Sequence, residues 1–178
     1  ELKHGTAGEW LDTAGGSVLS ALVGKMLPLV TMMLLMTLLM FLILFDIVGV
    51  PLNGSLAMLL CGCMLFILAY MSIGVLIISL MSNLRMSLSL GGGYSVLAFT
   101  FSGLTFPMMA MYPWIRAFSK VFPFTYYTDL FIDQALRGAP IIDSVWDMGY
   151  IALFIVLPML CLPRLREICT NEKYWGRL

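Results

Sequence analysis

Charged side chains are scarce in this sequence. Lysine, arginine, aspartate and glutamate together make up 11% of the 178 residues, whereas 61% are hydrophobic. Soluble domains carry charge on about a quarter of their residues. The ten basic and ten acidic residues leave no net charge, so nothing in the composition indicates a nucleic acid or another polyanion as a partner. Scarce charge together with abundant apolar residues disfavours an ordinary soluble domain.

Residues that commonly carry catalysis or hold metal ions are also scarce. His4 is the single histidine, which excludes an HExxH zinc site or a Ser-His-Asp triad built within this chain. Gly24-Lys25 is followed by Met26 rather than Ser or Thr, so this stretch is not a Walker A motif. The four cysteines show neither paired metal-ligand spacing nor a disulfide framework. We therefore expect no catalytic residue, no bound cofactor and no metal site in this chain.

Long hydrophobic runs, by contrast, are present. A helix needs about 20 apolar residues to cross the hydrocarbon core of a bilayer. We expect four transmembrane helices, at about 24–46, 55–81, 87–107 and 144–163. A chain of this length could not cover four such helices with polar elements, so the solvent around them must be lipid. None of them has an acidic residue at its centre, which disfavours a proton-coupled transporter and an intramembrane enzyme.

Basic residues are distributed unevenly between the two sides that four alternating helices would define. One side holds Lys3, Lys25, Arg85, Arg164, Arg166, Lys173 and Arg177. The other side holds Arg116, Lys120 and Arg137, together with Asp46, Asp129, Asp133 and Asp143. Because basic residues are enriched in cytoplasmic loops, this distribution predicts that both ends of this chain are cytoplasmic.

A short helix is predicted before the first span, at about 6–14. Thr6 and Glu9 have the spacing of a capping box, with Thr6 at the N-cap and Glu9 at N3. Gly15-Gly16 then interrupts the helix, and Ser17 can cap the next one. From spacing alone, an interfacial anchor held by Trp10 explains this helix equally well.

The outer segment at about 108–138 is too long for a simple turn. It contains an amphipathic stretch that Pro113 can begin and Pro123 would end, and a second stretch that stops at Arg137-Gly138. The first stretch places on one helical face Trp114, Ile115, Phe118, Val121 and Phe122. Two half-length helices predict an extracytoplasmic re-entrant or interfacial hairpin, and the alternative is an ordinary loop lying on the membrane surface.

Three stretches of the sequence resemble the permease subunit of ABC exporters of the ABC-2 type. The first is Glu1 to Leu11, which is similar to the family's acidic and basic stretch followed by Gly-Thr-x-Glu-x-Leu. The second is Gly24-Lys25-Met26-Leu27-Pro28. The third and most specific runs from Phe101 through Pro113-Trp114 to Tyr127, with Arg137-Gly138 after it. One departure is Thr13-Ala14, where many members have Thr-Pro or Ser-Pro.

The resemblance implies a six-helix permease half in a bacterial cytoplasmic (inner) membrane, of which this chain is the C-terminal four helices. The short N-terminal helix would then be a coupling helix that docks on the ATP-binding subunit. Its coupling residues would be Gly5, Thr6, Glu9, Trp10 and Leu11. The hairpin would be a re-entrant element, whose outer gate would include Pro107, Pro113, Trp114 and Pro123.

The function implied by the resemblance is ATP-driven export of a substrate, with ATP bound and hydrolysed on a separate subunit. The implied partners are that ATP-binding subunit, a second permease copy in a homodimer or heterodimer, membrane lipids and, in drug-efflux members, a periplasmic adaptor protein. The alternative is a membrane anchor or scaffold that moves nothing. A scaffold needs neither the short capped helix nor the hairpin, so copurification with an ATPase would discriminate between the two.

Overall fold

The computed structural model describes residues 6–81, 83–105 and 107–171. Within these ranges the elements are all helical and no strand is present, which confirms the predicted all-α class. The elements are α1 (Ala7–Thr13), α2 (Val18–Leu42) with the π-helical turn η1 (Ile43–Ile47), α3 (Leu56–Met81), α4 (Leu84–Phe101), the 3-10 turn η2 (Met108–Ala110), α5 (Pro113–Ser119), α6 (Pro123–Phe131) with the π-helical turn η3 (Ile132–Arg137), α7 (Ile141–Val156), the 3-10 turn η4 (Leu157–Cys161) and α8 (Leu162–Thr170).

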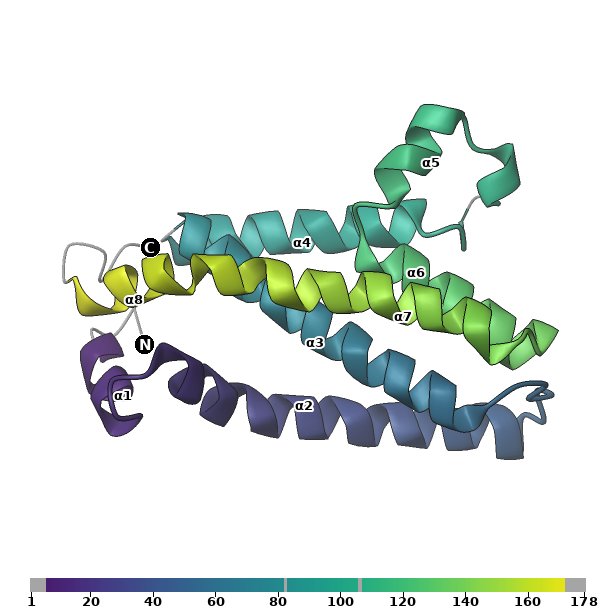
Figure 1. The fold of residues 1–178 in the computed structure, drawn as a ribbon, viewed down its shortest axis with the longest axis horizontal. Coiled ribbons are helices and arrows are strands. Elements are labelled where there is room, and N and C mark those ends of the chain that lie inside the picture. The colour runs from purple at the N-terminus through teal and green to yellow at the C-terminus, as the bar shows by residue number, and fades with distance from the viewer. Residues whose placement is uncertain (1–5, 82, 106, 172–178) are drawn as a thin grey trace.

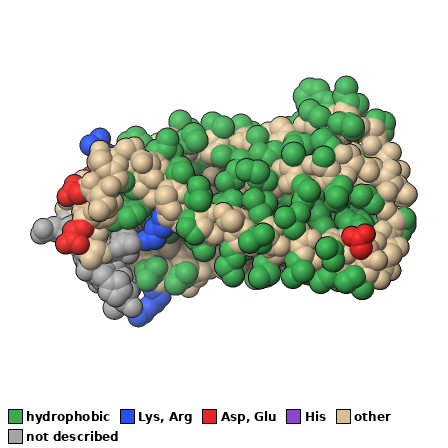
Figure 2. Space-filling model, turned by 90° about the horizontal axis from the view of Figure 1, so that it is seen from below, with side chains coloured by type: hydrophobic (Ala, Val, Ile, Leu, Met, Phe, Trp, Pro, Cys, Tyr) green, Lys and Arg blue, Asp and Glu red, His purple; other side chains and the backbone are tan. Residues whose placement is uncertain are grey.

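The connections between the helices lie at the two ends of the molecule. In Figure 1, α1, α8 and the start of α2 lie at one end, where α3 also passes into α4, whereas α5, α6 and the link between α2 and α3 lie towards the other end. Lys25 lies near the start of α2, Arg85 in the first turn of α4 and Arg166 in α8, so these basic residues belong to the same end. Figure 2 shows a broad hydrophobic belt between the ends, with most of the charged side chains on that face gathered at one of them.

Three helical segments are long and apolar enough to cross a membrane, namely Val18–Ile47, Leu56–Met81 and Ile141–Thr170. These segments expose most of their apolar side chains, as Leu35 at 61% and Met40 at 63% on α2 illustrate. Such exposure would be costly in water and is ordinary in lipid. The chain is therefore a multi-pass membrane protein.

The helix expected at 87–107 is shorter than predicted, since α4 ends at Phe101. Gly103 adopts a left-handed conformation with φ of +93°, which ends the helical ladder. Ser102 stays buried there, and its Oγ donates a hydrogen bond of 2.8 Å to the Phe99 carbonyl. With 18 residues, α4 is about 27 Å long at 1.5 Å per residue. Four spanning helices therefore remain a prediction.

The last predicted span also differs from its expected bounds of 144–163. Its helix begins earlier, at Ile141. Pro158 lies in η4, where the α-helix tightens into a 3-10 turn, because proline has no N–H to donate to the preceding turn. Helix α8 then continues to Thr170, burying Leu165, Ile168 and Cys169. The sequence predicted only a basic tail at this position.

Two buried clusters hold the ends of the bundle together. One joins Ala7 and Leu11 of α1 to Val18 of α2 and to Leu165 and Cys169 of α8. The other comprises Phe41, Leu59, Leu130 and Ala135, with Phe45, Leu52, Leu60, Phe131 and Met148 packed against it. Both clusters pack elements that are distant in sequence, so they fix the tertiary arrangement at each end of the bundle.

Candidate functional site

Helix α1 forms where the sequence predicts it, but without the predicted capping box. Thr6 occupies the N-cap position, and its carbonyl accepts a hydrogen bond of 3.0 Å from Trp10 N. Its side chain makes no capping hydrogen bond, because its ψ of 11° is not the extended conformation that an N-cap side chain needs. The helix ends at Gly15-Gly16, both with positive φ, and Gly16 N donates to the Leu11 carbonyl at 2.9 Å.

The two faces of α1 have different environments. Ala7 is fully buried and Leu11 is 5% exposed, and both belong to the cluster that includes α8. Glu9 and Asp12 are exposed, and their spacing of three places them on neighbouring positions of the opposite face. Trp10 is half-buried at the edge, with Lys25 Nζ 5.5 Å from its ring centroid, a cation–π distance.

The residues predicted to couple therefore do not form one surface. Leu11 points inward and holds α1 to the bundle, whereas Glu9 is available to a partner. Gly5 lies outside the described residues. Sequence reasoning missed Asp12, although this residue follows Glu9 by three positions and therefore lies beside it on a helix. It also missed α8. The amphipathic pattern of this helix directly follows the long apolar run of the last predicted span and has Pro163 in its first turn.

At the opposite end of the bundle, the hairpin residues predicted as a gate are divided between two environments. Pro107 precedes η2 and Pro113 begins α5, and both are exposed, as is Trp114 at 72%. Pro123 instead is buried at the first position of α6. In Figure 1, α5 projects from the bundle beyond the end of α4. The four residues thus flank or belong to α5, and their role as a gate stays a prediction.

Arg116 joins helix α5 to the segment that precedes it. The guanidinium donates through Nε at 3.2 Å and through Nη2 at 2.9 Å to the Met108 carbonyl. Ser119 is buried, and its carbonyl accepts a hydrogen bond of 2.7 Å from Thr125 Oγ1 on α6. These contacts make α5 a defined arm joined to α6 by a tight turn.

Helix α6 is embedded between α3 and α7 by aromatic contacts. Tyr127 stacks on Phe66 of α3, with ring centroids 4.5 Å apart, and Phe124 lies 5.5 Å from the same ring. On the other side, Tyr126 stacks on Tyr150 of α7 at 4.9 Å. Offset and tilted ring pairs of this kind add to the stabilisation from burial alone. The second half of the hairpin is therefore part of the bundle core.

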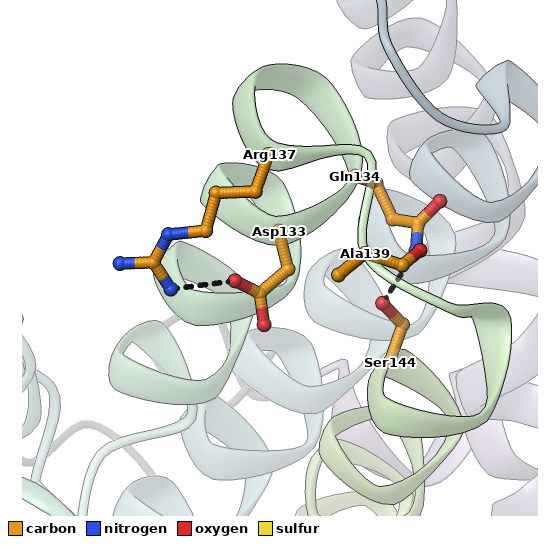
Figure 3. A network of polar contacts seen from close by, with 5 residues as sticks. All are labelled: Asp133, Gln134, Arg137, Ala139 and Ser144. Atoms are coloured by element: carbon orange, nitrogen blue, oxygen red, sulfur yellow. Dashed lines mark hydrogen bonds and ion pairs between the residues drawn. The ribbon is translucent and has the colours of Figure 1, made fainter.

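A buried amide joins three elements at the end of the bundle opposite α1, as Figure 3 shows in part. Gln134 is fully buried. Its Nε2 donates to the Ala139 carbonyl at 3.2 Å and to Ser144 Oγ at 2.8 Å, and its Oε1 accepts from Ser55 N at 3.1 Å. We call the set Asn53–Ser55, Gln134–Ala139 and Ser144 the outer junction.

Two glycines allow the outer junction to close. A Cβ on Gly54 would lie 2.5 Å from the Gln134 carbonyl oxygen, and a Cβ on Gly138 would lie 2.9 Å from the Asn53 carbonyl oxygen. Asn53 adds two bonds across the junction, from its backbone N to the Ala135 carbonyl at 3.2 Å and from Nδ2 to the Leu136 carbonyl at 2.7 Å. Sequence reasoning missed this arrangement, since only the Arg137-Gly138 helix end had been predicted there.

Acidic residues of α6 and η3 interact beside the outer junction. Arg137 Nη1 donates to Asp133 Oδ1 at 2.8 Å, as Figure 3 also shows. Burial raises the pKa of Asp129, and the neighbouring charge of Asp133 raises it further, against the opposing effects of Arg137 and Lys120. Within residues 6–81, 83–105 and 107–171 no group of three or more His, Cys, Asp and Glu side chains is placed to hold a metal ion.

Comparison with known proteins agrees with these features. A family model described as ABC-2 family transporter protein matches residues 2–161. No curated protein and no solved structure matches the chain. The matched range contains α1, the long helices and the whole outer hairpin. Since it covers most of the sequence, the chain belongs to the ABC-2 transporter family, whose members are transport components of the membrane.

Proposed function

We propose that this chain is the permease part of an ATP-driven exporter, and that α1 is the surface through which a separate ATP-binding subunit acts on it. Membership of the ABC-2 family and the multi-pass architecture support a transport role. The chain itself carries out no bond chemistry in this proposal. ATP binding and hydrolysis belong to the partner, and a second permease copy completes the path for the substrate.

The observation that carries this proposal is the two-faced construction of α1. Its apolar face is fixed in the cluster with α8, so the helix has a defined position at the end of the bundle. Its other face offers Glu9 and Asp12 to the solvent. A partner with a basic cleft complements such a face, because opposite charges steer association and fix orientation. A simple interfacial anchor would instead carry basic residues on its polar face, where α1 carries Glu9 and Asp12.

The orientation and the hairpin complete the proposal. The end that holds α1, α8 and the α3–α4 link faces the cytoplasm, in keeping with its basic residues, and α4 serves as the fourth span. The segment α5–η3 is the re-entrant element at the outer leaflet. There the exposed Pro107, Pro113 and Trp114 and the buried Pro123 control the outer exit.

The test is copurification of the full-length permease with its ATP-binding subunit from membranes. We expect Glu9→Lys combined with Asp12→Lys to lose the partner and the permease-dependent stimulation of ATP hydrolysis, because the substitution reverses the charge of the docking face. The matched control is Asp46→Lys combined with Asp143→Lys, which changes exposed acids at the opposite end and should leave both measurements unchanged. Normal copurification and stimulation in the α1 variant would refute the docking role.

The same experiment separates an exporter from a scaffold. An exporter's ATP-binding subunit hydrolyses ATP at a rate that depends on the permease in the membrane. A scaffold would copurify with a partner whose ATP hydrolysis is indifferent to the α1 substitutions. That second result would favour the anchor or scaffold alternative.

A further inference from the structure

Helix α8 provides part of the surface on which α1 rests, together with the start of α2. The buried face of α1 consists of Ala7 and Leu11, and it packs in one cluster with Leu165 and Cys169 of α8, which are 5% and 3% exposed. In Figure 1 the two helices lie at the same end of the bundle although they belong to opposite ends of the described chain. Neither helix is long, so each depends on the other for burial of its apolar face.

The backbone link from α1 to the bundle is soft by comparison. It runs from Ala14 to Ser17 and includes Gly15 and Gly16, with φ of 68° and 75°, and a Cβ on either would meet nothing within 4 Å. Two glycines in open space give the backbone wide freedom. A displacement of α1 is therefore transmitted through side-chain packing more than through the peptide chain that leads to α2.

Side-chain packing leads from α1 into two spanning segments. Helix α8 continues through η4 into α7, so a tilt of α8 acts directly on the last span. Val75 of α3 and Leu162 at the start of α8 pack against the same cluster. Packed interfaces tend to shift between discrete arrangements rather than to deform smoothly, which suits the transmission of a movement from one end of the bundle.

We propose that α8 is a brace that keeps α1 in position and carries its displacement into α7 and α3, with Leu165 and Cys169 as positioning residues. The two helices move as one body during the transport cycle, and the Gly15-Gly16 link bends to allow it. This inference rests on the docking role of α1 proposed above. It assigns a coupling task to residues outside the predicted coupling helix.

The first test locks the two helices together. Ala7→Cys is introduced into a full-length permease in which Cys61, Cys63 and Cys161 are replaced by alanine and Cys169 is kept. We expect oxidation to form a disulfide between the introduced thiol and Cys169, visible by mass spectrometry. Permease-dependent ATP hydrolysis should stay within about twofold of the reduced sample, since one rigid body is unaffected by an internal bond. The control is the same background with Ala7 unchanged.

Two results of the locking experiment would overturn the proposal. One is a disulfide that abolishes ATP stimulation, with stimulation restored on reduction, because α1 would then have to slide on α8. The other is failure to join the two thiols in the folded complex either by oxidation or with a short bifunctional maleimide, which does not need disulfide geometry, because the two helices would then not lie side by side.

The second test weakens the brace. Leu165→Ala removes a buried side chain between α8 and α1, and we expect it to lower permease-dependent stimulation of ATP hydrolysis by about fivefold or more, the scale of an ordinary coupling between sites. Leu165→Met should restore most of it. The matched control is Leu160→Ala, which makes the same change on a side chain that is 80% exposed. Equal activities for the Leu165→Ala and Leu160→Ala variants would contradict the brace.

The two proposals fail in distinguishable ways. If α1 is not the docking surface, the charge-reversed Glu9 and Asp12 variant still binds the ATP-binding subunit. If α1 docks but α8 is no brace, that variant loses the subunit while Leu165→Ala behaves like Leu160→Ala. If Leu165→Ala does not accumulate in the membrane, the locked disulfide, which leaves Leu165 in place, decides the question.

Discussion

Gln134 is a buried amide that satisfies its polar atoms across three elements. An amide taken out of water without partners is costly, and removing one partner leaves the others unpaired. Its hydrogen bonds to Ser55, Ala139 and Ser144 therefore make the side chain irreplaceable by an apolar one of similar size. The same reasoning applies to Gly54, whose lack of a Cβ is what admits the Gln134 backbone.

At the residue scale we expect both Gln134→Leu and Gly54→Ala to destabilise the protein. The first leaves buried polar atoms unsatisfied, at a cost of about 1–3 kcal/mol, and the second forces backbone atoms apart. The control is Gly149→Ala on α7, where a Cβ meets nothing within 4 Å. Thermal unfolding of the purified protein in detergent measures all three. A midpoint for Gly54→Ala equal to that of Gly149→Ala would contradict the close packing of the outer junction.

Asp129 gives a pH-dependent prediction. Its folded-state pKa is raised by burial and by Asp133, so its contribution to stability is fully present below the unfolded pKa and is lost as the pH rises through the folded pKa. We expect Asp129→Asn to raise the unfolding midpoint at neutral pH. We also expect the midpoint of this variant to depend less on pH, between pH 4 and pH 8, than that of the wild type. Unfolding measured between pH 4 and pH 8, with Asp143→Asn as the exposed control, tests this. An unfolding midpoint that falls more steeply with rising pH in the Asp129→Asn variant than in the wild type would contradict a raised pKa of Asp129.

At the scale of elements, the sequence predicted helices better than it predicted their ends. The second span was expected at 55–81 and the helix is Leu56–Met81, because an uninterrupted apolar run bounded by polar residues leaves little choice. Ser17 caps α2 as predicted, accepting from Ser20 N at 3.4 Å. The end of α4 was missed because Gly103 and Pro107 do not interrupt the apolar run, and only the backbone conformation reveals the break.

The short elements show what the sequence alone could not supply. Helix α8 was missed because the last predicted span ended at Pro163, whereas the structure accommodates this proline in the first turn of α8. The outer junction depends on contacts between residues about 80 positions apart in the chain, such as Ser55 with Gln134. No local pattern encodes such a contact. In the sequence, Gln134 lies between Asp133 and Arg137 and reads as one more polar residue of an amphipathic helix.

Gly16→Ala is an informative change at this scale. Gly16 has φ of 75° and its N–H closes the end of α1 on the Leu11 carbonyl. A residue with a Cβ adopts this conformation at a cost of about 1 kcal/mol. We expect faster amide hydrogen exchange in α1 for this variant, with exchange in α3 unchanged. Gly24→Ala inside α2 has open space and ordinary φ, and it should leave exchange in α1 at the wild-type rate.

For the whole molecule, the alternation of the predicted helices indicated which connections lie at the same end. The structure places α1, α8 and the α3–α4 link together and the outer hairpin apart from them (Figure 1). Alternation is readable from the sequence because it depends only on the number and length of the apolar runs, whereas the cytoplasmic side that the basic residues indicate stays a prediction.

Sidedness can be measured directly by cysteine labelling of spheroplasts in a variant without native cysteines. We expect Asp143→Cys to react with a membrane-impermeant maleimide from outside, and Asp12→Cys to react only after permeabilisation. Both positions are exposed in the structure. A difference in their labelling therefore shows on which side of the membrane each lies, and not how deeply each is buried in the protein. Reaction of Asp12→Cys in sealed spheroplasts would reverse the orientation and remove the docking proposal with it.

The hydrogen bond from Asn53 Nδ2 to the Leu136 carbonyl, at 2.7 Å, has a practical consequence for production in eukaryotic cells. Asn53-Gly54-Ser55 has the sequence of an N-linked glycan acceptor, and this nitrogen is the atom to which the sugar is attached. Attachment before folding would set a bulky oligosaccharide against η3 and hold the loop away from it. Asn53→Asp would remove the acceptor but also the donor, whereas Ser55→Ala removes the acceptor triplet and keeps the bond.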